Sequence, residues 1–133
     1  MALDYGSLGN VMQIRGDLDG AEAMYRKSLA IEEKLGRHEG MAIQYGNLGI
    51  SMATRGDIDA AEAMYRKSLA ISEKLSHLEG MANQYGNLGV VMLTRGDRDG
   101  ALEMWTKSRN LFAKIGAQPM VDKVQGWIDE LPG

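Results

Sequence analysis

The chain repeats its own sequence with a period of 40 residues, and this period limits the folds that it can adopt. Residues 5–9, 45–49 and 85–89 read YGSLG, YGNLG and YGNLG, and the stretch 21–31 recurs unchanged as 61–71. A period of about 20 to 50 residues indicates stacked units, each too small to bury its own apolar face. The sequence holds three such units, about the minimum for a stable array.

Each unit is predicted to form two helices. In the second unit the first helix runs from about residue 39 to 55 and the second from about 58 to 75. At about 100° per residue, the first helix places a stripe of glycine and alanine beside a bulky apolar stripe, which consists of Met41, Tyr45, Leu48 and Met52. Glycine inside a helix costs roughly 1 kcal/mol relative to alanine. Gly46, Gly49 and their equivalents Gly86 and Gly89 therefore predict close approach of neighbouring helices.

The triplet Arg-Gly-Asp occurs at 15–17, 55–57 and 95–97, where the first helix of each unit is expected to end. Glycine can adopt the left-handed conformation that terminates a helix, and aspartate can cap the next one. An integrin-binding motif is the alternative interpretation. The position of all three triplets between helices favours a turn.

The tail departs from the period. With an offset of 39 residues, Val124 falls in the column of Tyr85 and Trp127 in that of Leu88. This pattern predicts a seventh helix that imitates a first helix and caps the array. Phe112 replaces Glu32 and Ser72 in the surface that this helix would cover. Nothing equivalent precedes Leu3, so we expect an uncapped N-terminal helix.

These repeats resemble tetratricopeptide repeats. The family pattern W-x2-L-G-x2-Y followed by A-x3-F is matched by Tyr45-x2-Leu48-Gly49-x2-Met52 and Ala61-x3-Tyr65, and Trp105 takes the aromatic column in the third unit. The period exceeds the family's usual value of about 34, and the closing proline is missing. This longer form is similar to the repeats of kinesin light chains and Pins-type adaptors. The resemblance implies a right-handed superhelix whose first helices line a concave groove that holds peptides or partner helices.

We therefore expect an all-α protein with a single domain over residues 1–133. It is predicted to be a right-handed α-solenoid of three helix-turn-helix repeats, at 2–41, 42–81 and 82–118, with a capping helix at 119–131.

The charge balance and the missing residue types exclude several classes of function. Fifteen lysines and arginines against eighteen aspartates and glutamates give a net charge of -3, which argues against nucleic acid or an anionic membrane as a partner. The lack of cysteine excludes disulfides, thiolate metal sites and cysteine nucleophiles. Residues 1–6 do not read as a signal peptide, and no run of about 18 apolar residues exists. We expect a cytoplasmic protein.

Groups suited to catalysis or metal binding are sparse. His38 and His77 are the two histidines, and both are expected to be exposed in turns between repeats. The glycines of 46–49 lie within a helix rather than in a phosphate-binding loop. The methionine columns suit irregular packing between helices better than copper. We expect no enzyme activity, no cofactor and no metal.

One face of the first helices is not assigned to packing between helices. Its predicted peptide-binding residues are Asn10, Ile43, Asn47, Ile50, Thr54, Asn83, Asn87, Val90 and Thr94. Asparagine favours helices poorly, and its amide offers both a donor and an acceptor. We expect Asn47 and Asn87 to bind the backbone of an extended peptide while the aliphatic neighbours take its side chains. This face lacks the lysines and arginines with which chaperone-tail binders of the family clamp a carboxylate. Asparagine is also common there in family members without a known peptide.

The sequence leaves a second role open. The array could self-associate, for example as a homodimer through the uncapped N-terminal helix, or form one piece of a longer superhelix in a multidomain regulator. A groove lined by amides favours recognition of a protein or peptide, whereas an exposed first helix favours the structural role.

Overall fold

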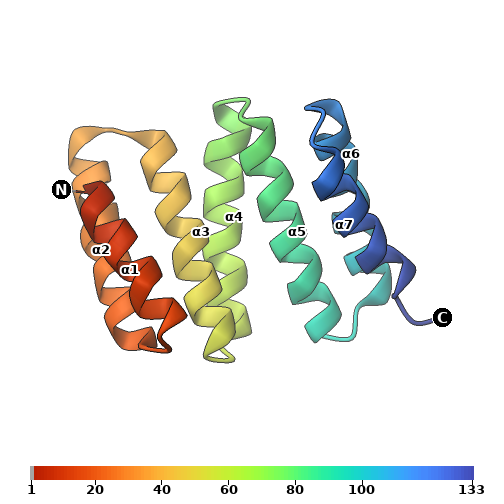
Figure 1. Ribbon diagram of the computed structural model, residues 1–133, viewed down its shortest axis with the longest axis horizontal. Helices are drawn as coiled ribbons and strands as arrows, with labels where there is room; N and C mark the ends of the chain where they lie inside the picture. The colour runs from red at the N-terminus through yellow and green to blue at the C-terminus, as the bar shows by residue number, and fades with distance from the viewer. Residues whose placement is uncertain (1) are drawn as a thin grey trace. The chain divides into compact units, whose positions relative to one another are not determined.

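A computed structural model describes residues 2–133, with side chains from Tyr5 onward (Figure 1). Within this range the secondary structure consists of α-helices, and there is no strand. The helices are α1 (Ala2–Ile14), α2 (Leu18–Leu35), α3 (His38–Thr54), α4 (Ile58–Lys74), α5 (Leu78–Thr94), α6 (Arg98–Lys114) and α7 (Gln118–Asp129). The all-α prediction is confirmed, and the bounds of α3 and α4 lie within one residue of those expected.

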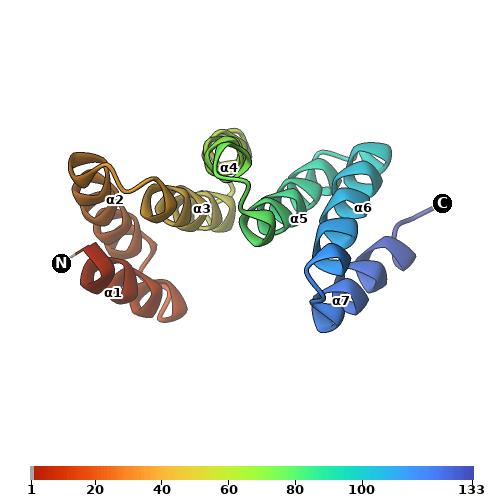
Figure 2. The same ribbon diagram turned by 90° about the horizontal axis from the view of Figure 1, so that it is seen from above.

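The chain forms two compact units. The first, Met1–Ile71, contains α1 to α3 and most of α4, and the second, Ser72–Gly133, contains the end of α4 and α5 to α7. In the first unit α1 packs on α2 and α2 on α3; in the second, α5 packs on α6 and α6 on α7 (Figures 1 and 2). Within each unit, this packing of consecutive helices is that of a helical-repeat solenoid.

The Arg-Gly-Asp triplets form the turns between the two helices of each repeat. Their glycines have φ values of 84°, 87° and 80°, at Gly16, Gly56 and Gly96. The following aspartate of each triplet accepts a hydrogen bond from the backbone amide three residues later, at 2.9, 3.2 and 2.8 Å. The predicted combination of a left-handed glycine and an aspartate N-cap is therefore confirmed.

Aromatic rings of the second helices lie directly against glycines of the first helices. A Cβ on Gly9 would lie 2.7 Å from the ring of Tyr25, and one on Gly89 would overlap the indole of Trp105. Gly49 stands in the same relation to Tyr65. The predicted close approach is confirmed at Gly49 and Gly89, because no side chain fits between ring and backbone there. It is wrong for Gly86, whose Cβ would make an ordinary contact of 3.5 Å with the Ser108 side chain.

The core of the first unit joins α2 to α3. It consists of Ala21, Tyr25, Leu29 and Leu48, with Met12, Met41, Tyr45 and Met64 packed around it. Ser51 of α3 adds a polar link, since its hydroxyl donates to Oε1 of Gln13 in α1 at 2.6 Å. Leu8 of α1 occupies the same repeat column as the buried Leu48 but is 44% exposed.

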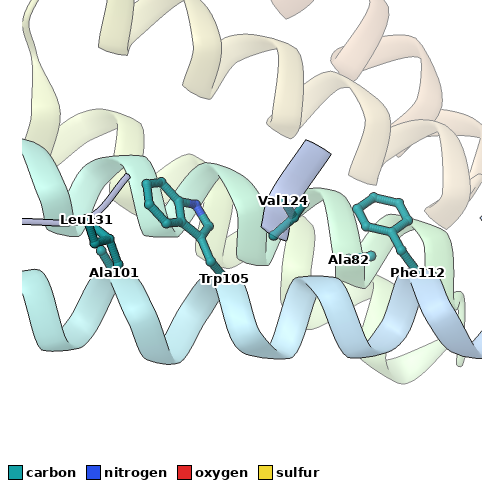
Figure 3. Close-up of a cluster of buried hydrophobic side chains, with 6 residues drawn as sticks. All are labelled: Ala82, Ala101, Trp105, Phe112, Val124 and Leu131. Atoms are coloured by element: carbon teal, nitrogen blue, oxygen red, sulfur yellow. The ribbon is translucent and has the colours of Figure 1, made fainter. Parts of the chain in front are cut away.

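The core of the second unit lies between α5, α6 and α7. Ala101, Trp105 and Phe112 project from the same side of α6, and Val124 of α7 is seen between the two aromatic rings (Figure 3). Ala82 of α5 and Leu131 complete the cluster. Phe112 and Val124 are almost fully buried. The predicted seventh helix is therefore present, and it covers the surface that Phe112 makes apolar.

Candidate functional site

The predicted binding residues lie on the first helices of the repeats, and we call them the amide face. In the first unit it comprises Asn10 on α1 and Ile43, Asn47, Ile50 and Thr54 on α3; in the second it comprises Asn83, Asn87, Val90 and Thr94 on α5. Its aliphatic members are exposed, to 53% for Ile43, 38% for Ile50 and 48% for Val90. Both α3 and α5 thus present apolar side chains to solvent beside a half-buried asparagine.

A buried glutamine orients each of the two central asparagines. Nδ2 of Asn47 donates to Oε1 of Gln44 at 3.3 Å, and Nδ2 of Asn87 donates to Gln84 at 3.2 Å. Both glutamines are buried, and Gln44 lies against Gly6 of α1, where a Cβ would be 2.9 Å from its amide nitrogen. One amide hydrogen is used in this way, and no hydrogen bond from the side chains described, those of residues 5–133, reaches Oδ1 of either asparagine.

Sequence reasoning gave these glutamines no role. The available signal was a glutamine three residues before each asparagine, a spacing at which two helical side chains can meet.

Other members of the amide face are already engaged within the protein. The hydroxyl of Tyr25 donates to Oδ1 of Asn10 at 2.6 Å, so this side-chain amide is engaged in a contact between α1 and α2. Thr54 donates to the carbonyl of Ile50 at 2.8 Å, and Thr94 makes the same bond in α5. The polar groups left to a ligand are therefore those of the two central asparagines and of Asn83, which is exposed on α5, beside their aliphatic neighbours.

A repeated contact between lysine and an aromatic ring was also missed from the sequence. Nζ of Lys67 lies 5.5 Å from the ring centre of Tyr45. The same pairing joins Lys27 to Tyr5 at 5.6 Å and Lys107 to Tyr85 at 5.4 Å. Each pair is a cation–π contact between the two helices of one repeat. The signal was a lysine 22 residues after each tyrosine.

The arginine of the second Arg-Gly-Asp triplet forms ion pairs with carboxylates of the preceding repeat. Arg55 pairs with Asp19 and, at 3.4 Å, with Glu22, both on α2. Hydrogen bonding to Asp19 is the largest of the effects that raise the pKa of Arg55. This guanidinium therefore links consecutive repeats, beside the glycine that ends α3 and the aspartate that caps α4.

Few groups suited to chemistry come together. His38 and His77 are both exposed. In the part of the chain that the structure describes, no three histidine or carboxylate side chains are grouped so that they could hold a metal ion. None of the helices in that part is both long and apolar enough to cross a bilayer.

Comparison of the chain with models of protein families identifies a known repeat. The family model described as tetratricopeptide repeat matches residues 1–74, and a second model of the same description matches residues 84–105. The chain belongs to the tetratricopeptide repeat family. Members of this family commonly serve as protein-interaction modules, because stacked repeats create extended binding surfaces. Comparison with curated proteins gave no match.

Solved structures share the tetratricopeptide repeat fold with this chain. BtubC (BKLC) from P. vanneervenii superposes with a TM-score of 0.73 at 23% identity, over 96% of this chain and 57% of that protein. A kinesin light chain-like protein of Podosopora anserina with nearly identical TPR-like repeats gives a TM-score of 0.79 at 18% identity, over 94% and 62%. A variant of that protein gives 0.78. The chain thus spans less than two thirds of the length of these proteins. The predicted similarity to kinesin light chain repeats is confirmed.

Proposed function

We propose that this tetratricopeptide repeat protein binds a peptide or partner segment through the amide face and performs no catalysis. The observation that carries the proposal is the pairing of exposed aliphatic side chains with an oriented amide. Ile43 and Ile50 flank Asn47 on α3, and Val90 lies one turn beyond Asn87 on α5. Each unit holds this arrangement independently.

The amide of each central asparagine suits the backbone of an extended peptide. Its Oδ1 can accept from a peptide N–H, and its remaining hydrogen can be donated to a peptide carbonyl. Because the buried glutamine fixes Nδ2, less side-chain entropy is lost on binding than for a free amide. Each neutral hydrogen bond formed in this way is worth about 0.5–1.5 kcal/mol.

The amide face contains no charged residue. The contribution of this face to binding should therefore depend weakly on salt. It should also show no preference for a terminal carboxylate, since no cation of this face could clamp one.

The test is selection from a random library of dodecapeptides, followed by calorimetry on the enriched sequences. Replacing Asn47 and Asn87 together by alanine should weaken binding by roughly 1–3 kcal/mol. Asn110→Ala, which changes an exposed asparagine of α6 outside the amide face, is the matched control and should leave affinity unchanged. Binding that survives the double substitution would overturn the proposal.

The stability of the double variant should change little. Alanine favours the helix more than asparagine does, whereas Gln44 and Gln84 each lose a hydrogen-bond donor. These effects oppose each other, so we expect the free energy of unfolding to stay within about 1 kcal/mol. A larger loss in a thermal melt would assign the asparagines a structural role instead.

A second candidate function is self-association through α1, favoured by the apolar side chains that this helix exposes. Leu8 and Val11 are each 44% exposed, and such patches often mark contact sites. Sedimentation should then show concentration-dependent dimers that Leu8→Ser abolishes, with Ile43→Ser as the control on another helix. A monomer at all concentrations would exclude this role.

A further inference from the structure

The second unit contains a cavity that its helices do not fill. It has a volume of about 270 Å³ and is lined by Val90, Leu93, Trp105, Trp127, Glu130 and Leu131. The two indole rings lie 5.6 Å apart between centres, inclined by 46°. Pockets for drug-sized ligands are usually about 300–1,000 Å³. The cavity is therefore of a size for one side chain rather than for an organic cofactor.

The cavity lies at a place where the repeat changes. Leu93 occupies the column of Gln13, and Glu130 occupies that of Ser51 once the 39-residue offset of α7 is applied. In the first unit these positions share a hydrogen bond. A leucine and a glutamate side chain do not share such a bond, and in the second unit both residues line the cavity.

The lining has a definite chemical character. Glu130 is its one charged residue, and no ion pair among the residues that the structure describes involves Glu130. The N–H of Trp105 donates to the carbonyl of Gly86 at 2.9 Å and so is not available to a ligand. The remaining features are aromatic surfaces, aliphatic walls and a carboxylate.

Such a lining complements a side chain with an apolar stem and a cationic head. The stem would lie along the aliphatic and aromatic walls, and the head would reach both the carboxylate and the negative face of an indole ring. The ring of Trp127 already accepts a cation in this protein, since Nζ of Lys123 lies 5.6 Å from its centre.

We propose that this cavity binds an arginine or lysine side chain of the partner peptide. Val90 belongs to both the cavity and the amide face, so a peptide lying along α5 could place one side chain in the cavity. The proposal rests on the proposed function, to which it adds a preference for a basic residue at one peptide position.

The chain offers its own probe for this test. Its two tryptophans both line the cavity, so intrinsic tryptophan fluorescence reports on this site. Acetylated, amidated pentapeptides with four glycines around a central arginine, lysine, citrulline or norleucine would be titrated. Arginine and lysine should give saturable changes with a Kd on the order of 1 mM. Citrulline, the neutral analogue of arginine, should bind roughly tenfold more weakly.

Two variants separate a specific contact from a general effect of charge. Glu130→Gln should weaken binding of the arginine peptide about fivefold and leave the citrulline peptide unaffected. Asp129→Asn removes the same charge from a neighbouring residue that does not line the cavity, and should change affinity less than about twofold. Equal binding of arginine and citrulline, equal effects of the two variants, or no saturable signal would overturn the proposal.

The dodecapeptide selection distinguishes this proposal from the function on which it rests. The intact protein should enrich a basic residue at one position, and Glu130→Gln should remove that preference. Peptides without a basic position that still require Asn47 and Asn87 would support the proposed function and overturn the assignment of the cavity alone. Failure to enrich any peptide would contradict the proposed function. The fluorescence titration would still show whether the cavity binds a basic side chain.

Discussion

In the first unit Ser51 and Gln13 join α3 to α1 by a hydrogen bond, whereas in the second unit the corresponding Glu130 and Leu93 face a cavity. The two units otherwise keep the same turns and the same contacts between an aromatic ring and a glycine. The repeat therefore keeps the turns and the close contacts that determine the backbone, while other side chains between the helices change from unit to unit. Binding properties can change at these positions without altering the fold.

The two units also differ in the polarity of their cores. The first places Tyr25 and Tyr65 in the aromatic column, and Tyr25 satisfies its hydroxyl through Asn10. The second places Trp105 there and adds Phe112, where the first unit has Glu32. The second unit thus gains apolar burial at the position where α7 covers α6.

The largest effect is expected for Phe112→Ala. Truncating this buried ring should lower the free energy of unfolding of the second unit by about 3–5 kcal/mol. Phe112→Leu, which keeps most of the volume, should cost under about 1.5 kcal/mol. Urea unfolding followed by tryptophan fluorescence measures this unit specifically, because both tryptophans belong to it. A loss below about 1 kcal/mol for the alanine variant would show that α7 does not depend on this ring.

The contact between ring and glycine should be the next most sensitive feature. Gly89→Ala should cost about 2–3 kcal/mol, because the added methyl overlaps Trp105. Gly86→Ala, one turn earlier in α5, is the matched control, since its Cβ would lie 3.5 Å from the nearest atom, in Ser108. That variant should gain up to about 1 kcal/mol in helix propensity. Equal costs for the two variants would contradict the close-approach argument.

Alkaline pH should distinguish Tyr65 of the first unit from Trp105, which occupies the same aromatic column in the second unit. Burial raises the pKa of Tyr65 to about 12 from 10.0, so the folded protein favours the neutral phenol. This contribution is fully present below about pH 10 and is lost as the pH rises toward about 12, by up to about 2 kcal/mol. Trp105 does not titrate.

The measurement is urea unfolding followed by circular dichroism at about pH 9 and about pH 11.5, on either side of the ordinary tyrosine pKa. Tyr65→Phe should lose less stability over this interval than the intact protein, which isolates the contribution of this residue from those of the other tyrosines and lysines. Identical losses in both proteins would place the alkaline effect elsewhere.

The smallest effect concerns the polar link of the first unit. A double-mutant cycle on Gln13→Ala and Ser51→Ala should give a coupling energy of about 0.5–1.5 kcal/mol. The corresponding pair in the second unit, Leu93→Ala and Glu130→Ala, should show almost none, because no hydrogen bond joins these residues. A similar coupling energy in both units would contradict the distinction between the hydrogen-bonded pair of the first unit and the pair that lines the cavity of the second.

The backbone features were largely predictable from the sequence because they are local and repeat in register. Glycine and aspartate between two helical patterns indicated the turns at 16–17, 56–57 and 96–97. Glycine within a helix indicated the close approach at Gly49 and Gly89. Periodicity with a shifted offset also predicted α7, since Val124 and Trp127 imitate the spacing of a first helix.

The side-chain contacts were less predictable because they depend on reach between helices. Periodicity placed Asn10 on the amide face, but it could not show that the hydroxyl of Tyr25 extends to it. The link from Asn47 to Gln44 required knowing which way the buried glutamine points. The cavity is lined by residues far apart in the chain, and neither Leu93 nor Glu130 is unusual by itself.

The stacking of lysines over aromatic rings divides the seven lysines of this chain into two chemical classes. Four of the ammonium groups lie over rings, at Lys27, Lys67, Lys107 and Lys123. The other three, Lys34, Lys74 and Lys114, are exposed at the ends of the second helices. A reagent that acylates amines must remove an ammonium group from its ring in the first class but not in the second. Mild acetylation should therefore mark the ends of the second helices first and leave the repeats intact.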